Sequence, residues 1–420
     1  MVPKLPPLPP ASSWYPGHMA LFAKNLPQLL SNTHVVLEAR DARLPLTSIN
    51  PNFEEMLEKW RKNRGGGLAG PVERVVVYNK VDLVPKWGVV PFERALSRHF
   101  DHKTIFTTAK LGKSMGSLHK HLTDIARTHG KEIQHLNVLV VGMPNVGKST
   151  ILNHLRSYGI KGARSNALKT SRLPGMTRAT SNRMRLCDDP LIYSIDSPGV
   201  MLPFLGYGDE ARERAVKISL ILAMKESLFD YEQLAAYLLF RLNSMNPKAP
   251  PYPALLSKPK NKQPVFPYTD SIEEFLQVLA TRMGYLLPGG VHDTSRAAKW
   301  FVEWWRGSAA EEENLGGTPE WGWGLDCQWV MDEPEEMPNH TMPTFLDSTE
   351  AKAEAAQERQ ILGVSDEELE WRFDTVIKRH LQRSKELLNE VSETQVKKRE
   401  KEEAMERREQ KRREMQHRKA

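Results

Sequence analysis

The sequence GMPNVGKST, residues 142–150, decides the fold class of this chain. It matches the pattern G-x-x-x-x-G-K-[S/T] and directly follows Val138–Val141, an apolar run typical of a buried strand. In such a loop the glycines let backbone N–H groups turn inward around phosphate groups, at the amino end of the next helix. We expect Lys148 to reach the terminal phosphates and Ser149 to ligate Mg²⁺. The residues expected to bind the phosphates are Asn145, Val146, Gly147, Lys148, Ser149 and Thr150.

A second motif, Asp196-Ser197-Pro198-Gly199, ends the apolar run Leu191–Ile195. An aspartate at the end of an apolar strand can hold Mg²⁺, and the backbone N–H of Gly199 can meet a γ-phosphate. Asp-x-x-Gly alone is also an ordinary turn sequence, but its place downstream of the phosphate loop favours a nucleotide site. Between the two motifs, Thr177 is expected to complete the magnesium shell. The predicted metal ligands are therefore Ser149, Thr177 and Asp196.

Two further motifs specify the base. Asn79-Lys80-Val81-Asp82 follows the apolar run Val75–Tyr78, and Thr108-Ala109-Lys110 follows Ile105–Thr107. The carboxylate of Asp82 can accept hydrogen bonds from both N1–H and N2–H of guanine, a pairing that adenine does not offer. Lys80 is expected to lie along the base, and Asn79 is expected to tie neighbouring loops together. Ala109 is expected to offer its backbone N–H to guanine O6. Each motif alone could be a helix cap, but together they predict guanine and disfavour an ATP-using kinase.

The apolar runs alternate with helical stretches, which predicts an α/β fold with a mostly parallel sheet and helices on both faces. After about residue 208 we expect no further strands. A helix is predicted over Asp209–Asn243, Ser271 and Glu274 form a capping box, and Trp304 and Trp305 are expected to be core residues. The expected strands are Val35–Leu37, Val75–Tyr78, Ile105–Thr107, Val138–Val141 and Leu191–Ile195.

The motifs stand in an unusual order, with the two base motifs before the phosphate loop. Circular permutation is physically permissible because all the loops converge at one edge of the sheet. With these motifs, Trp14–Met19 and Glu38–Pro45, the chain resembles the circularly permuted GTPases of the mitochondrial GTPase 1 and bacterial ribosome-biogenesis family over about residues 14–306. Ser197 departs from the family's usual threonine, and Thr107-Thr108 precede the Ala-Lys pair. An acidic segment (307–350) and a charged tail (351–420) fall outside the resemblance, and together with the Gly65–Gly70 insertion they favour a eukaryotic organellar member over a bacterial one.

We therefore expect a circularly permuted P-loop GTPase domain, a helical domain and a charged helical tail. The resemblance implies a GTP-binding and GTP-hydrolysing assembly factor of the mitochondrial large ribosomal subunit, acting as a nucleotide-controlled RNA-binding switch. The alternative is a GTP-dependent regulator of mitochondrial translation or inner-membrane complexes without a primary assembly role. The expected segments are a flexible N-terminus (1–13), the permuted G domain (14–208), the helical domain (209–306), an acidic irregular insert (307–350) and the charged tail (351–420).

The expected partners are GTP and GDP, the large ribosomal subunit and its rRNA, and no DNA. The mitochondrial family implies the matrix side, with peripheral contact to the inner membrane, although the first residues lack the arginine-rich pattern of a transit peptide. Two cysteines among 420 residues fit a reducing compartment. No apolar run approaches the roughly 18 residues that a membrane span needs.

Hydrolysis is expected to be slow without a partner, because Val200 stands where Ras has the glutamine that orients the attacking water. Asn145 resembles the residue of GTPases that use K⁺ as a positive charge between phosphates, which makes K⁺ a candidate second ion. His18 is either a residue that swings toward the γ-phosphate or part of a structural clasp, and the two are weighed equally. With Thr177 and Gly199, these residues form the predicted catalytic set.

The net charge of +7 is unevenly distributed along the chain. Residues 1–306 hold 41 basic and 25 acidic side chains, whereas residues 307–351 hold 11 acidic and no basic ones. The stretch from Lys161 to Arg185 carries seven basic residues and no acidic one, which favours contact with phosphate-rich RNA. A solvated loop covering the nucleotide is the alternative. A second basic face is expected on the helix with Arg296, Lys299 and Arg306. The tail over 397–420 could bind rRNA or an anionic membrane, but a solvated helix is favoured.

Overall fold

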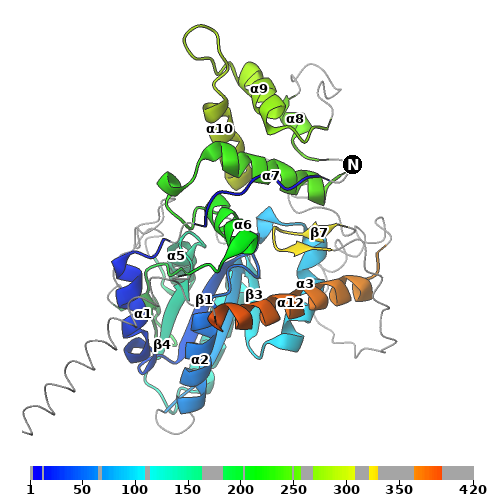
Figure 1. Ribbon diagram of the computed structural model, residues 1–420. Coiled ribbons are helices and arrows are strands. Elements are labelled where there is room, and N and C mark those ends of the chain that lie inside the picture. Colours follow the sequence, from blue (N-terminus) through cyan, green and yellow to red (C-terminus); the bar gives the residue numbers. More distant parts are fainter. Residues whose placement is uncertain are drawn as a thin grey trace, which may run out of the picture.

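The structure is a computed structural model, and its centre is a six-stranded sheet in the order β3-β2-β1-β4-β6-β5 (Figure 1). It describes residues 3–11, 14–64, 69–108, 114–162, 183–201, 204–247, 250–256, 268–307, 321–329 and 364–389. All neighbouring strands are parallel except β5, which is antiparallel to β6. The strands are β1 (Val35–Asp41), β2 (Glu73–Asn79), β3 (Lys103–Thr107), β4 (Leu136–Gly142), β5 (Met184–Cys187) and β6 (Ile192–Asp196).

Helices cover both faces of this sheet. Along β2, Val75 and Val77 pack into one apolar cluster, whereas Val76 and Tyr78 pack into a second cluster on the other face. This two-residue alternation shows that the strand is buried on both sides, which explains its continuous apolar sequence. The flanking helices are α1 (Gly17–Leu30), α2 (Pro51–Arg64), α3 (Val89–His99), α4 (Met115–Thr128) and α5 (Lys148–Gly159). The α/β class and the mostly parallel sheet are confirmed.

Strand β5 is not among the strands predicted from the sequence. Its charged Arg185 is exposed between the buried residues Met184 and Leu186, as befits an edge strand with one solvated face. Arg183, just before this strand, stacks on the ring of Tyr193 in β6 at 4.4 Å. The four-residue strand lies at the end of a strongly basic stretch, so its short apolar alternation was obscured by its charges.

The helical part of the chain is divided differently from the prediction. One helix was expected over Asp209–Asn243, but the chain breaks between α6 and α7, where Leu222 has a φ of 60° and Asp230 caps α7 through the N–H of Glu232. The capping box is confirmed in one of its two bonds: the Ser271 hydroxyl accepts from the N–H of Glu274 at 3.3 Å, whereas the N–H of Ser271 donates to the Thr269 hydroxyl. Trp304 and Trp305 are buried, as expected. The helices are α6 (Gly208–Leu220), α7 (Tyr231–Met245), α8 (Pro253–Leu256), α9 (Ile272–Met283) and α10 (Thr294–Gly307).

Residues 321–329 are not irregular, and strands do not stop at residue 208. Strands β7 (Gly322–Trp323) and β8 (Cys327–Gln328) form a small antiparallel hairpin. The side chains of Trp323 and Cys327 are completely buried, in the apolar cluster that contains α3. The acidic composition of the surrounding segment concealed these apolar residues, which bury themselves against the sheet-bearing domain.

The described part of the charged tail forms a helix, and one side of this helix is buried. Helix α12 (Asp366–Asn389) packs along α3, as Figure 1 shows. Its residues Leu369, Phe373 and Ile377 recur every four positions and are completely buried. A helix with one such apolar stripe is amphipathic, and it gains stability by burying the stripe. The residues 397–420 lie outside the described part of the chain, and the domain boundaries at 208 and 306 stay predictions.

Of the helices in the described part of the chain, none combines a membrane-spanning length with an apolar sequence. Both cysteines are free and buried: Cys187 lies in the apolar cluster with α5, and Cys327 lies in the hairpin.

The docking of α12 can be tested with Phe373→Ala. Phe373 is buried between Phe92, Trp323 and Trp329, with ring centroids 5.2 to 5.7 Å apart. Removing a buried phenyl ring leaves a cavity, so the free energy of unfolding should fall by about 3–5 kcal/mol in urea titrations. Gln382→Ala, on the exposed side of the same helix, is the control and should change it by less than about 0.5 kcal/mol. Equal effects of the two variants would mean that α12 is not docked.

Candidate functional site

The predicted motifs meet at one edge of the sheet, where the parallel strands end. The loops after β2, β3, β4 and β6 carry the Asn-Lys-x-Asp, Thr-Ala-Lys, phosphate-loop and Asp-x-x-Gly motifs, respectively. In the sheet, β2 and β3 lie on one side of β1, whereas β4, β6 and β5 lie on its other side. The phosphate loop therefore lies at the point where the strand order reverses, which is where ligands bind in open α/β sheets.

The phosphate loop has the backbone that its sequence requires. Asn145 and Gly147 have φ angles of 59° and 97°, and a Cβ atom at Gly147 would lie 2.2 Å from Nδ2 of Asn79. Glycine is needed at position 147 for both reasons. The loop passes directly into α5, whose amino end presents unpaired N–H groups that favour an anion.

Lys148 is the buried cation of this loop. Its ammonium donates to the carbonyl oxygens of Gly142 and Met143 at 3.2 and 2.8 Å. Burial lowers the pKa of Lys148 to about 8, and the nearby carboxylate of Asp196 opposes this shift. A phosphate group would add negative charge beside the ammonium, which should restore its pKa toward the ordinary value.

Ser149 and Asp196 form an oxygen-rich pair suited to Mg²⁺. The Ser149 hydroxyl donates to Oδ2 of Asp196 at 3.0 Å. Burial raises the pKa of Asp196, while Lys148 and the hydrogen bond from Ser149 oppose the shift. Mg²⁺ is usually held by one or two protein oxygens together with substrate phosphates, so this pair fits the ion. Thr177, the third predicted ligand, lies outside the described residues. Among those described, no group of three or more His, Cys, Asp or Glu side chains could hold a metal.

The Asp-x-x-Gly loop lies directly on the phosphate loop. The N–H of Val200 donates to the carbonyl of Gly142 at 3.1 Å, and a Cβ atom at Gly199 would lie 2.6 Å from Cα of Pro144. Gly199 is thus required by close packing. Val200 and the following Met201 are buried apolar residues, so neither side chain can orient water.

Asn79 and Lys80 join the base motif to the phosphate loop. The Asn79 amide donates to the carbonyl of Val146 at 2.8 Å, and Lys80 donates to the carbonyl of Asn145 at 2.7 Å. Asp82 lies half-buried in the 3-10 turn η1 (Val81–Leu83), which follows Lys80.

The second base motif is only partly described. Thr108 is buried, and its N–H donates to the Ser114 hydroxyl at 3.3 Å. Ala109 and Lys110 lie outside the described residues.

Asp41, which ends β1 beside these loops, is not among the predicted site residues. Its carboxylate accepts from the Arg43 guanidinium at 2.9 and 2.8 Å and from Lys80 at 2.8 Å. Burial alone would raise the pKa of Asp41, but Arg43 and Lys80 outweigh it and hold the pKa far below its usual range. The sequence signal was weak, because Glu38 and Arg40 separate Asp41 from the apolar run Val35–Leu37.

Asn145 and His18, two of the four predicted catalytic residues, lie in different parts of the structure. Nδ2 of Asn145 donates to the carbonyl of Leu222 at 2.5 Å, which connects the phosphate loop to the break between α6 and α7. His18 is half-buried in the first turn of α1. Their roles in hydrolysis stay predictions.

The basic face predicted on α10 is smaller than expected. Arg306 donates to the carbonyl oxygens of Leu220 and Ser219 at 2.8 Å, and only 9% of its side chain is exposed. It therefore joins α10 to α6 and is not available to RNA. Arg296 stacks on Tyr285 at 4.2 Å, and Lys299 remains about half exposed. Helical spacing identified the face correctly but could not indicate which of its cations would be buried by a neighbouring helix.

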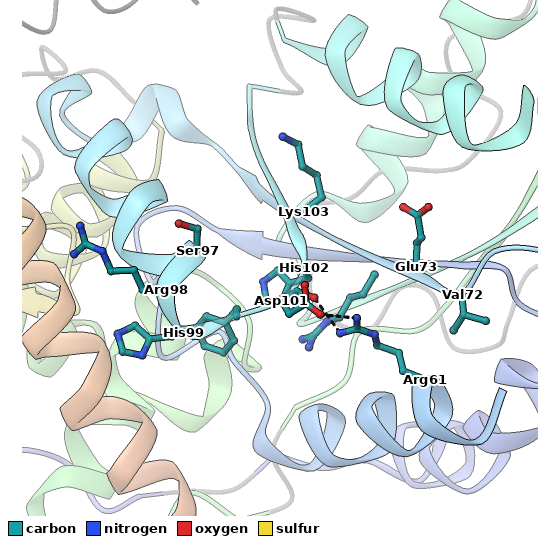
Figure 2. Close-up of a pocket in the computed structure, with 11 residues that line it drawn as sticks. Arg61, Val72, Glu73, Ser97, Arg98, His99, Asp101, His102 and Lys103 are labelled. Carbon is teal, nitrogen blue, oxygen red and sulfur yellow. Dashed lines mark hydrogen bonds and ion pairs between the residues drawn. The ribbon is translucent and has the colours of Figure 1, made fainter. Parts of the chain in front are cut away.

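A charged pocket of about 600 Å³ lies at the opposite edge of the sheet (Figure 2). Its walls include Glu73 and Lys103, which begin β2 and β3, so it is separate from the predicted nucleotide motifs. Inside it, burial and the nearby Arg40 and Arg74 lower the pKa of His102 to about 3. His102 is consequently neutral at physiological pH.

Comparisons with known proteins find similarity to GTPases. A family model described as "50S ribosome-binding GTPase" matches residues 137–248. Mitochondrial GTPase 1 of Schizosaccharomyces japonicus is 31% identical over 315 residues, which cover 70% of this chain and 87% of that protein. Mitochondrial ribosome-associated GTPase 1 of Mus musculus is 30% identical over 234 residues, covering 55% and 66%. The crystal structure of GNP-bound YlqF from T. maritima has a TM-score of 0.43 at 20% identity, covering 70% and 97%.

The lowered pKa of Lys148 predicts proton uptake when a nucleoside triphosphate binds. Near pH 8 about half of the free protein has a neutral Lys148, and the phosphates should favour the ammonium form. Binding should therefore take up about half a proton at pH 8 and weaken as the pH rises further. Calorimetric titrations in two buffers with different ionisation enthalpies measure this uptake. Lys148→Arg, which stays charged, is the control, and identical uptake in both proteins would contradict the prediction.

Proposed function

The chain belongs to the mitochondrial GTPase 1 family, and we propose that it is an assembly factor of the mitochondrial large ribosomal subunit. In this proposal it hydrolyses GTP and acts as a nucleotide-controlled RNA-binding switch. The observation that carries the proposal is the direct contact between the phosphate loop and the helical part of the chain. Through the Asn145–Leu222 hydrogen bond, a change at the phosphates can reach α6 and α7.

The proposed nucleotide contacts follow from the geometry of the loops. Lys148 and the amino end of α5 would bind the phosphates, and Ser149 and Asp196, with Thr177, would hold Mg²⁺. Bound Mg²⁺ would neutralise the charge that develops on the phosphates. Asp82 would accept from N1–H and N2–H of guanine, with Asn79 and Lys80 fixing its loop on the phosphate loop.

The switch would operate along two routes. The Asp-x-x-Gly loop rests on the phosphate loop and leads within ten residues into α6, so a shift of Gly199 can move that helix. The second route is the hydrogen bond from Asn145 to Leu222, between α6 and α7. Because both routes lead to α6 and α7, these helices can change position with the bound nucleotide.

The proposed RNA contacts are basic groups with at least partly free charge. Arg296 and Lys299 lie on the exposed side of α10. Lys161 and Arg183 belong to the basic stretch from Lys161 to Arg185, of which residues 163–182 lie outside the described part of the chain. The name of the mouse relative and the description of the family model support a ribosomal partner. Relatives named as mitochondrial support a mitochondrial location, and we place the protein on the matrix side with peripheral contact to the inner membrane.

Sucrose-gradient sedimentation of mitochondrial lysates tests the assembly role. With a non-hydrolysable GTP analogue the protein should comigrate with large-subunit particles, and with GDP it should move to the top fractions. Asp82→Asn is the matched control, because an amide in place of the carboxylate should weaken guanine binding and abolish the effect of the analogue. Absence of the protein from large-subunit fractions with either nucleotide would favour regulation of translation or membrane complexes instead.

The activation of hydrolysis is tested by changing the monovalent ion. We expect faster GTP turnover in K⁺ than in Na⁺, with Oδ1 of Asn145 as a ligand of K⁺ while its Nδ2 holds Leu222. Asn145→Ala should remove the difference between the two ions. His18→Ala should lower turnover stimulated by ribosomal particles if His18 reaches the γ-phosphate. Equal turnover in both ions, unchanged by particles and by His18→Ala, would exclude both mechanisms.

A further inference from the structure

The hairpin of residues 321–329, called here the C-terminal hairpin, contacts the segment that follows the base motif. The indole N–H of Trp323 donates to the carbonyl of Pro85 at 2.9 Å. The same ring closes over Gly88 at the end of the turn η2 (Lys86–Gly88), where a Cβ atom would lie 2.3 Å from Cδ1 of Trp323. The hairpin therefore fixes the chain three to six residues beyond Asp82.

The same hairpin also fixes the loop after β1. The N–H of Leu325 donates to the carbonyl of Arg43 at 2.9 Å. The carboxylate of Asp326 accepts from the N–H groups of Leu46 and Thr47 at 2.9 and 2.7 Å and from the Thr47 hydroxyl at 2.6 Å. Asp41, the last residue of β1, directly precedes this loop and accepts a hydrogen bond from Lys80 of the base motif. The hairpin therefore supports the base motif by a second route.

On its other side the hairpin contacts the helical part of the chain. The Arg241 side chain of α7 donates to the carbonyl of Leu325 at 2.9 Å and to the side chain of Gln328. The ammonium of Lys217 in α6 lies 3.6 Å from Oδ1 of Asp326. Figure 1 shows the hairpin, in yellow, between the green helices and the sheet-bearing domain.

Helix α12 packs against the hairpin. The ring of Phe373 packs edge-on against Trp323 with centroids 5.7 Å apart. Glu370 pairs with Arg94 and Arg98 of α3 at 2.7 and 2.5 Å. Trp323 is therefore enclosed between α3 and α12, with an orientation determined by packing.

We propose that the C-terminal hairpin positions the guanine-recognition loop (Lys80–Gly88) and links it to the helical part of the chain, with Trp323 and Asp326 as positioning residues. The loop itself consists of two short 3-10 turns and begins at Lys80 in the left-handed conformation, with a φ of 65°. Such a loop has little intrinsic order. If it were not held in place, ordering it would weaken guanine binding, since only the ordered fraction is competent to bind. The proposal rests on the guanine site proposed above.

The test compares Trp323→Phe with the matched control Trp329→Phe. Trp323→Phe removes the hydrogen bond from the indole N–H to the carbonyl of Pro85. Trp329 belongs to the same hairpin and packs on Phe373, with ring centroids 5.2 Å apart. The dissociation rate of a fluorescent GDP analogue should rise about five-fold in Trp323→Phe, which corresponds to one lost hydrogen bond, and stay unchanged in Trp329→Phe.

The ratio of GTP to ITP affinity separates positioning from general destabilisation. Inosine lacks the N2 amine that Asp82 would accept from, so this ratio reports how well Asp82 is placed. Trp323→Phe should lower the ratio, and so should Asp326→Ala, which loosens the supporting loop from the opposite side. A loss of stability alone would lower both affinities and leave their ratio unchanged.

Asp82→Asn distinguishes failure of this inference from failure of the guanine site. If Asp82→Asn lowers the GTP-to-ITP ratio but Trp323→Phe and Asp326→Ala do not, the positioning role is wrong and the guanine site stands. If Asp82→Asn leaves the ratio unchanged, the guanine site is wrong and the positioning role falls with it. A reduced ratio in all three variants, with Trp329→Phe unchanged, supports the inference.

Discussion

The side chain of Asn79 holds together the two loops on which the proposed nucleotide site depends. It donates to Val146 in the phosphate loop and accepts from the Thr107 hydroxyl at the end of β3. Strands β2 and β4 are separated by β1, so no main-chain hydrogen bond of the sheet joins their loops directly. The contact also requires the absence of a side chain at Gly147. One amide and one missing Cβ atom thus bring a base motif and a phosphate loop, 67 residues apart, into a single site.

The parts of the fold that were predictable from sequence are those encoded by local patterns. Five of the six strands in the sheet contain a short apolar run, most clearly β2 and β4, which are buried on both faces. The motifs directly follow four of these strands at the carboxyl edge. The permuted order was predictable for the same reason, since each motif could be assigned to a strand end. Strand β5 escaped because one of its faces is solvated. Asp41 escaped because its partners, Arg43 and Lys80, become visible only in three dimensions.

The C-terminal elements could not be predicted because their partners are distant in sequence. Trp323 and Pro85 are 238 residues apart, and nothing in an acidic, glycine-rich segment indicates which element its tryptophans will cover. Helix α12 does show an apolar stripe, but the stripe alone does not indicate which element it will cover. The charges of α12 are partly directed at α3, where His99 and Asp374 lie 2.6 Å apart. A charge-rich sequence is therefore compatible with specific docking when its acidic residues meet basic ones on the neighbouring helix.

The permutation gives the helical domain contacts with both ends of the proposed nucleotide site. At the phosphate end, Asn145 binds the carbonyl of Leu222, between α6 and α7. At the base end, Arg241 and Lys217 bind the hairpin that holds Pro85. A movement of α6 and α7 relative to the sheet must therefore alter contacts at both ends. Because linkage is reciprocal, a partner that prefers one arrangement of these helices must change nucleotide affinity by the same factor by which the nucleotide changes affinity for that partner.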